Sequence, residues 1–165
     1  MDARLQAVPR LPAARRSAHD AGSRAAFATG APFAGAPAFL RALDAVGAGI
    51  DAFAIPVERT RGPILMMSAE DDQLWASARL AAIAEERLRS RGFAYPFEHV
   101  RYPAAGHFAC MPPNLPATST SGRHPVVPLT RAFGGSPRGN AAASADLWPR
   151  IVRFLHRHLA RAAGE

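Results

Sequence analysis

The sequence contains no lysine and a single cysteine, and each shortage excludes a class of chemistry. All 20 basic residues are arginines, so neither a lysine Schiff base nor the lysine of a phosphate-binding loop is available. Cys110 has no second cysteine in the chain, which excludes an internal disulfide framework and a cysteine-ligated zinc site. One cysteine does not identify a redox compartment, and we take the cytoplasm as the expected location.

Long apolar runs and large apolar side chains are also scarce. No run of about 18 apolar residues occurs, so the sequence predicts no membrane-spanning helix. Leu, Ile, Val and Phe together make up 34 of the 165 residues, close to the fraction at which a highly charged chain is suspected of disorder. Much of the 48% apolar composition is alanine. We therefore expect a thin core.

The net charge of +7 is a feature shared with proteins that bind nucleic acids. Here, however, the arginines are scattered among Ala, Pro and Gly, and no aromatic-rich platform accompanies them. We interpret them as a bias in composition and predict no nucleic-acid partner. The sequence does not predict an oligomeric state.

The chain divides near residue 37. Residues 1–36 hold Pro, Gly, Arg and Ala with no sustained period and are predicted to be disordered. Residues 37–162 carry the periodic apolar pattern of a folded domain, which begins with a helix that ends at Gly47.

A strand, helix and strand follow in that order. The short apolar run at 64–67 predicts a buried strand, and the amphipathic pattern at 75–91 predicts a helix. The alternating pattern at 97–102 predicts a second strand. Such a unit usually pairs its strands in parallel through a right-handed crossover. The sequence therefore predicts an α/β fold.

The region after His107 is expected to be a loop of more than 30 residues, rich in Pro, Ser, Thr and Gly. Loops of this length are usually functional or disordered. The last helix is expected to start near Asp146, because Pro149 suits a first turn. An extension back through Ala141 stays open at this stage.

An acid and a histidine stand just beyond the two predicted strands. Asp72 follows the first strand and His107 follows the second, and the carboxyl ends of parallel strands are where active-site residues gather. A carboxylate that accepts the N–H of a histidine orients the ring and stabilises its charged form. Asp72 could instead cap the following helix. The paired spacing favours a catalytic pair.

Five other features are weaker candidates. Ser23 follows a glycine without a preceding strand, and Cys110 is interpreted as a small apolar filler. His99 and His124 have no partner that the sequence identifies. The pair Gly134-Gly135 is interpreted as a turn, because no phosphate-binding fingerprint accompanies it.

Eight segments, in order and at similar spacing, carry a family resemblance over about residues 37–160. They are Ile-Pro-Val-Glu-Arg at 55–59, Gly-Pro-Ile-Leu at 62–65, Ser-Ala-Glu-Asp-Asp-Gln-Leu-Trp at 68–75, Tyr-Pro-Ala-Ala-Gly-His at 102–107, Pro-Pro at 112–113, Gly-Gly-Ser-Pro at 134–137, Asp-Leu-Trp at 146–148 and Phe-Leu-His-Arg-His-Leu at 154–159. Together they resemble the C-terminal domain shared by acyl-CoA thioesterases and bile acid-CoA:amino acid N-acyltransferases. Ala69 departs from the glycine that is usual before the acid pair, and Ala76 stands where proline is frequent.

The resemblance implies the C-terminal part of an α/β-hydrolase fold with an incomplete sheet, and it implies a Ser or Cys nucleophile, Asp72 as triad acid and His107 as base. In this architecture the acid commonly lies three residues after a small residue that closes the strand. Ala69 takes that place, which selects Asp72 over Asp71. The implied substrate is a coenzyme A thioester, with no further cofactor and no metal.

The nucleophile is missing from this pattern. The family's Gly-x-Ser/Cys-x-Gly turn belongs upstream of Asp72 and occurs nowhere in the 165 residues. We therefore expect an N-terminally truncated domain that is inactive alone. The alternatives are an amino acid N-acyltransferase of the same family and a catalytically inactive remnant.

Overall fold

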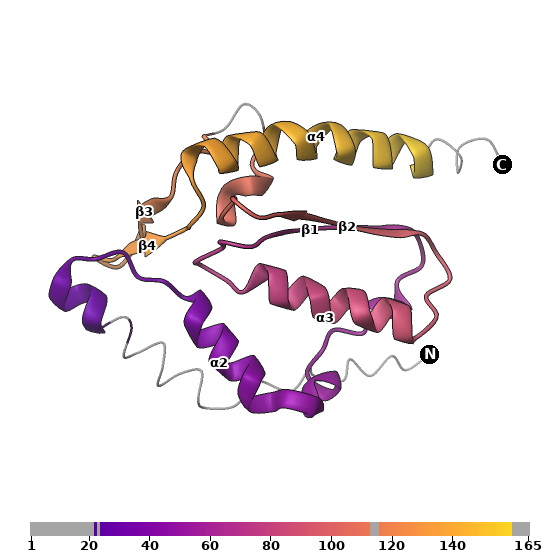
Figure 1. Cartoon of the computed structure of the whole chain (residues 1–165), viewed down its shortest axis with the longest axis horizontal. Coiled ribbons are helices and arrows are strands. Elements are labelled where there is room, and N and C mark those ends of the chain that lie inside the picture. The colour runs from indigo at the N-terminus through magenta and orange to yellow at the C-terminus, as the bar shows by residue number, and fades with distance from the viewer. Residues whose placement is uncertain (1–21, 23, 113–115, 160–165) are drawn as a thin grey trace.

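The computed structural model describes residues 22, 24–112 and 116–159. Two parallel strands, β1 (Ile64–Ala69) and β2 (Phe97–Tyr102), lie between two helices. Helix α3 (Ser77–Ser90) packs on one face of this sheet and α4 (Pro137–Leu159) covers the other (Figure 1). The predicted α/β class is confirmed, and a two-stranded parallel sheet with flanking helices is consistent with part of an α/β-hydrolase fold.

The strand–helix–strand unit forms as the pattern predicts. The strands pair in register from Ile64 opposite Phe97 to Ala69 opposite Tyr102. Helix α3 begins at Ser77, two residues later than expected. The Ser77 hydroxyl donates to the Ala69 carbonyl (3.1 Å) and accepts the Ala69 N–H (3.3 Å), so the start of the helix satisfies backbone groups at the end of β1.

The remaining elements are short or lie at the ends of the molecule. Helix α2 (Ala36–Val46) lies on the α3 side of the sheet and continues into the 3₁₀ turn η1 (Gly47–Ala52) (Figure 1). Two further 3₁₀ turns are η2 (Val57–Arg59) and η3 (His107–Cys110).

The region after His107 is more ordered than the predicted long loop. It contains an antiparallel hairpin of β3 (Ser121–Arg123) and β4 (Thr130–Ala132). A three-residue strand is too short to show an alternating apolar pattern, so periodicity alone could not reveal the hairpin.

Helix α4 starts at Pro137, nine residues before the expected start at Asp146, and Pro149 lies inside it. The Ser136 hydroxyl accepts the Gly139 N–H at 3.0 Å, and Pro137 follows it directly. A capping serine with proline at the first helical position is a recognised start signal. The helix is anchored where Ser144 and Trp148 both donate to the Met111 carbonyl, at 2.6 and 2.8 Å.

Part of the N-terminal segment packs against the domain. Residues 24–29 are helical, and the buried Phe33 bridges to Arg131 of β4. The packed part of the chain thus starts before residue 37, where the sequence pattern predicts the domain to begin. The rest of the segment predicted to be disordered, 1–21 and 23, lies outside the described residues.

Small side chains form the core between the sheet and α4. Ala69, Ala105, Ala109 and Ala143 make one buried cluster, and Met67 and Tyr102 pack around it. Alanines let backbones approach closely but bury little apolar area each, so this core is thin, as the composition predicts.

The pair Gly134-Gly135 lies between the two loops that follow β1 and β2. Gly134 bridges to Asp72, and Gly135 bridges to Ala105. Both glycines have positive φ, at 74° and 70°. A Cβ atom on Gly134 would stand 1.8 Å from the Asp71 carbonyl oxygen, so only glycine fits this position.

A polar cluster fills the opposite face of the sheet, beneath α3. Ser68 on β1 hydrogen-bonds to His99 Nε2 (2.8 Å), and His99 Nδ1 hydrogen-bonds to Glu85 (2.8 Å). Arg101 and Arg89 also donate to Glu85. The hydrogen bond to His99 and those from the arginines outweigh the effect of burial and lower the pKa of Glu85 from 4.5 to about 2.

Replacing Gly134 with alanine tests the close approach. We expect Gly134→Ala to lower the free energy of unfolding by at least about 2 kcal/mol more than Gly92→Ala, measured by urea denaturation. Gly92 is the matched control because it also has positive φ (61°) but no atom within 4 Å of a built Cβ. Equal losses in the two variants would mean that only backbone conformation, and not the contact, requires glycine.

Acid titration tests the Glu85 cluster. Since folding lowers the pKa of Glu85 from 4.5 to about 2, its ionised form stabilises the fold above pH 4.5 and this contribution disappears as the pH falls towards 2. Glu85→Gln should therefore reduce the unfolding free energy near pH 6, and the difference from wild type should close in acid. The exposed neighbour Glu86 provides the control, and a Glu86→Gln difference of the same size and pH course would contradict this account.

Candidate active site

Two loops at the carboxyl end of the sheet carry the candidate residues. Asp72 lies three residues beyond β1, and His107 lies five residues beyond β2. His107 Nδ1 lies 3.2 Å from Asp72 Oδ2, although 35 positions separate the two residues along the chain. Parallel pairing brings both loops to one edge of the sheet, and the spacing in the sequence predicts this meeting.

Asp72 is a buried carboxylate whose hydrogen bonds all favour the ionised form. Its side chain is 4% exposed. Oδ1 accepts the N–H groups of Leu74 and Trp75, both at 3.0 Å, and Oδ2 faces His107. Burial would raise the pKa of Asp72, but the hydrogen bonds from His107 and the Trp75 amide outweigh it, and the pKa is lowered. Asp72 is therefore ionised at neutral pH.

The alternative role of Asp72 as the cap of the next helix does not fit the geometry. The residue before the first turn of α3 is Ala76, and no side chain caps that helix. Asp72 instead accepts amides of the turn that precedes the helix. This turn holds the carboxylate in place beside His107.

The His107 ring lies among three aromatic side chains and is partly exposed to solvent. Its side chain is 27% exposed. The ring centroid lies 5.6 Å from that of Trp75, 5.8 Å from Phe108 and 6.3 Å from Phe133. With Nδ1 directed at Asp72, Nε2 is the ring atom left for a reacting group.

The neighbouring carboxylate, Asp71, has a different set of partners. Its Oδ2 accepts the Gly135 N–H at 2.8 Å and its Oδ1 accepts from Gln73 at 3.2 Å. It makes no hydrogen bond to His107. Asp71 therefore ties the acid loop to the glycine pair, and of the two acids only Asp72 contacts the histidine.

The residues that hold the two loops together were not predicted from the sequence. Gly134-Gly135 was interpreted as a simple turn, but it bridges both loops. The fully buried Asn140 on α4 accepts the Gly106 N–H at 2.6 Å and donates to the Gly134 carbonyl at 3.4 Å. No sequence signal marks Asn140, since its partners lie 34 and 6 residues away.

The other candidate residues do not contribute to this site. His99 has two partners that the sequence did not reveal, but its side chain is 1% exposed and Ser68 is fully buried, so no substrate can reach this cluster. Cys110 is exposed, which makes its interpretation as an apolar filler wrong, and its thiol donates to the His107 carbonyl at 3.7 Å. Ser23 lies outside the described residues.

The site places a partly exposed histidine beside a buried carboxylate that can orient it. Among the described residues, no hydroxyl or thiol hydrogen-bonds to the His107 ring, and no group of three His, Cys, Asp or Glu side chains could hold a metal ion. What the geometry offers is proton transfer through His107 Nε2.

Known proteins similar to this chain share a C-terminal region. The mouse (Mus musculus) peroxisomal succinyl-coenzyme A thioesterase is 34% identical over 116 residues, which are 70% of this chain and 27% of the mouse protein. Human (Homo sapiens) acyl-coenzyme A thioesterase 6 is 35% identical over 105 residues, 64% of this chain and 24% of the relative. Mouse mitochondrial acyl-coenzyme A thioesterase 2 is 38% identical over 105 residues, 64% of this chain and 22% of the relative.

The alignments thus span about a quarter of the length of these relatives. A family model described as "BAAT / Acyl-CoA thioester hydrolase C terminal" matches residues 37–161. This match contains all four strands, α3, α4, and the Asp72 and His107 loops. The chain therefore belongs to the BAAT / acyl-CoA thioester hydrolase C-terminal family.

Proposed function

We propose that this chain is an acyl-CoA thioester hydrolase domain in which His107 is the general base and Asp72 the carboxylate that orients it. The observation that carries the proposal is the buried hydrogen bond between Asp72 and His107 at the carboxyl edge of a parallel sheet. Membership of the thioesterase family supports the choice of substrate class.

The proton path starts at the buried acid. Ionised Asp72 accepts a hydrogen bond from the Nδ1–H group of neutral His107, so the lone pair of Nε2 is free. Nε2 takes the proton of an attacking hydroxyl or thiol as that group adds to the thioester carbonyl. When the carbon–sulfur bond breaks, the imidazolium returns this proton to the leaving sulfur and free coenzyme A departs. The negative charge of Asp72 stabilises the imidazolium between the two transfers.

A second transfer completes the cycle. Water, or an amine, adds to the covalent acyl intermediate while His107 Nε2 again accepts a proton. The bond between the acyl group and the nucleophile then breaks, the imidazolium returns the proton to the nucleophile, and the acyl group leaves as an acid or an amide. The family description joins both outcomes, since it names a thioester hydrolase beside BAAT. We propose hydrolysis as the reaction, because the relatives described above are all called thioesterases.

No residue of this sequence is proposed as the nucleophile. The Gly-x-Ser/Cys-x-Gly turn that would hold one is not present in the 165 residues. We propose that the acid and base act on a nucleophile from outside this sequence, and that the chain alone does not turn over thioesters.

The location of the protein in the cell stays a prediction. In the described part of the chain, no helix combines the length and the hydrophobicity that crossing a bilayer requires. The names of two relatives refer to the peroxisome and the mitochondrion. The cytoplasmic location expected from the sequence is therefore one of several compartments to be tested.

A hybrid enzyme tests the proposed roles. Residues 37–159 would replace the matched region of mouse acyl-coenzyme A thioesterase 2, and release of free thiol from acyl-CoA would be followed. We expect an active hybrid in which His107→Ala or Asp72→Asn lowers kcat roughly 10²–10⁴-fold, because each removes part of the base. The chain alone should release thiol no faster than buffer.

Asp71→Asn in the same hybrid is the matched control. Asp71 lies next to Asp72 but makes no hydrogen bond to His107. The amide oxygen of an asparagine can still accept the Gly135 N–H that Asp71 accepts, so this variant keeps the loop contact and should keep most of the rate. A hybrid that retains full activity with His107→Ala, or that loses as much with Asp71→Asn as with Asp72→Asn, contradicts the assigned roles.

A further inference from the structure

One edge of the parallel sheet has no neighbouring strand. In the described part of the chain, β1 pairs with β2 alone. The Ile64 N–H donates to the Pro96 carbonyl at 3.1 Å, and alternate residues of a parallel strand bond to the same neighbour. The even-numbered residues of β1 therefore direct their backbone groups at β2, and the odd-numbered residues direct theirs at the open edge.

The open edge carries four backbone groups that lack a partner. Both backbone groups of Ala69 bond to the Ser77 hydroxyl. The N–H and C=O groups of Leu65 and Met67 have no hydrogen-bond partner among the described residues. Both residues are only half-buried, although helices lie on both faces of the sheet. Such an edge is a template for pairing with another strand.

A line of six exposed or half-buried apolar residues runs along α4. They recur every four and three positions and are Ala141, Ala145, Trp148, Val152, Leu155 and Leu159. Val152, Leu155 and Leu159 are 46%, 45% and 63% exposed. This spacing is the pattern of a seam between two packed helices, and no arginine of α4 lies on it. We call these six residues the α4 seam.

The α4 seam lies on the same side of the molecule as the open edge. The Tyr102 hydroxyl of β2 donates to Asp146 of α4 at 2.9 Å. Arg150 of α4 pairs with Glu98 of β2 at 3.6 Å, so this flank of the helix faces β2. At 3.6 residues per turn, the seam lies on the opposite flank, with the buried face of the helix between them. Since α4 runs along both strands (Figure 1), its seam lies beside the free edge of β1.

The α4 seam is complementary to itself in the antiparallel direction. An antiparallel pair of α4 helices centred on position 150 sets Ala141 opposite Leu159, Ala145 opposite Leu155, and Trp148 opposite Val152. Each alanine thus faces a leucine, which fills the space between the helices. Parallel packing would set alanine against alanine and leave gaps.

The open strand edge is also complementary to itself. An antiparallel pair of β1 strands centred on Met66 sets Leu65 opposite Met67 of the second copy, so all four unpaired groups gain partners. Ala69, whose groups are already bonded, then lies opposite Pro63, which has no N–H.

One two-fold axis serves both contacts. Arg150, at the centre of the seam, contacts Glu98, and Glu98 is in register with Leu65, next to Met66. The two centres therefore lie at about the same level of the sheet. Neighbouring strands lie about 4.8 Å apart, so an axis beside β1 sets two helices that each cover both strands roughly 10 Å apart. Packed helices usually lie about 8–10 Å apart.

We propose that a second copy of this chain docks on this surface and forms a two-fold dimer, with the β1 edges paired antiparallel and the α4 seams packed together. The inference goes beyond the proposed function and does not depend on it.

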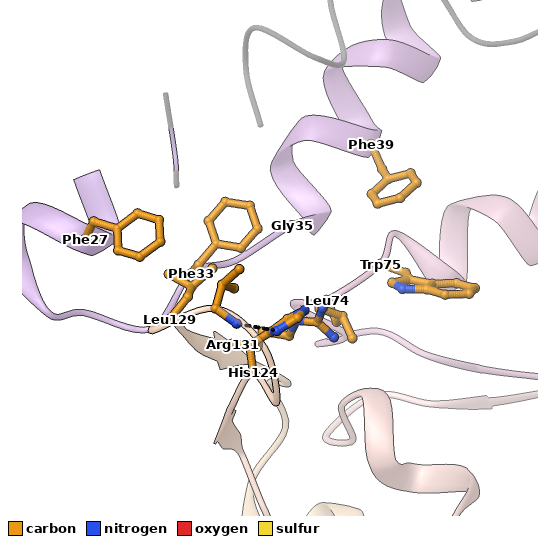
Figure 2. A pocket seen from close by; sticks show the side chains of 10 residues that line it. Phe27, Phe33, Gly35, Phe39, Leu74, Trp75, His124, Leu129 and Arg131 are labelled. Carbon is orange, nitrogen blue, oxygen red and sulfur yellow. Dashed lines mark hydrogen bonds between the residues drawn. The ribbon is translucent and has the colours of Figure 1, made fainter. Parts of the chain in front are cut away.

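The docking surface is separate from the candidate site. A cavity of about 400 Å³ lies beside the loop that follows β1, and Phe33, Leu74 and Trp75 are among its walls (Figure 2). Neither the open edge nor the α4 seam contributes a residue to it. The Asp72 and His107 loops likewise contain no residue of the surface.

The mass of the full chain in solution tests the dimer. Sedimentation equilibrium should give 35 kDa, twice the 17.5 kDa of one chain, at about 100 µM protein. Leu155→Arg should raise the dissociation constant at least about tenfold, because it sets two guanidinium groups without partners in an apolar seam. The matched control is Leu40→Arg on α2, since Leu40 is 42% exposed and lies outside the surface. This control should keep the wild-type constant, and circular dichroism would confirm that both variants are folded.

A double variant tests the antiparallel direction. Ala145→Glu alone should also weaken the dimer. Ala145→Glu/Leu155→Arg should bind at least about threefold more tightly than either single variant, because each new carboxylate then faces a guanidinium of the second copy. The two positions are ten residues apart on one helix, so they cannot pair within a chain.

Amide hydrogen exchange tests the strand contact. The Leu65 and Met67 amides should exchange slowly in the wild-type dimer and quickly in Leu155→Arg. The Met66 and Ser68 amides face β2 and should stay protected in both. Fast exchange of Leu65 and Met67 in the wild-type dimer would overturn the strand pairing.

Three results of the mass measurements would overturn the proposal. A wild-type chain that stays at 17.5 kDa would do so, and would leave the open edge to a strand of a different polypeptide. A dimer that Leu155→Arg leaves unchanged, or that Leu40→Arg weakens equally, would place the contact elsewhere. A double variant no tighter than the single variants would exclude the antiparallel seam.

Discussion

The structure of the site depends on one close backbone approach, in which Gly134-Gly135 is inserted between the acid loop and the histidine loop. Gly134 bridges to Asp72 and Gly135 bridges to Ala105. Asp71 accepts the Gly135 N–H, and Asn140 contacts Gly106 on one side and Gly134 on the other. A two-stranded sheet is weakly stabilised by itself. This insertion fixes the distance between Asp72 and His107 where the sheet alone would not.

The same approach explains why the core around it is built from alanines. Ala69, Ala105, Ala109 and Ala143 let α4 lie close to the loops, so that Asn140 can reach the Gly106 amide at 2.6 Å. Larger side chains would bury more area but would move the helix outward. The polar side of the molecule compensates in part, because Glu85, His99 and Ser68 form a satisfied network under α3. Stability and site geometry thus come from opposite faces of one small sheet.

Features that a local sequence pattern marks could be predicted, and features that depend on contacts between distant segments could not. The 64–67 strand follows from an apolar run and the 97–102 strand from an alternating pattern, and the meeting of Asp72 with His107 follows from the geometry of parallel pairing. Asn140, the partners of His99 and the insertion of Gly134-Gly135 depend on contacts between separate segments, such as the 34 positions between Gly106 and Asn140 or the 14 between Glu85 and His99, which no local pattern records. The early start of α4 had a local signal in Ser136-Pro137, but Pro149 carried more weight in the interpretation. The exposed position of Cys110 likewise follows from tertiary packing alone.

The central claim is that Asp72 holds His107 with its Nε2 lone pair free. Nitrogen-15 NMR of histidine-labelled protein above the titration range of the ring, assigned with His107→Ala, measures this directly. The account predicts that neutral His107 carries its proton on Nδ1. It also predicts that the neutral ring in Asp72→Asn is a mixture of the Nδ1-protonated and Nε2-protonated tautomers. A neutral His107 protonated on Nε2 in the wild-type chain would contradict it, because that ring could not accept a proton from a nucleophile.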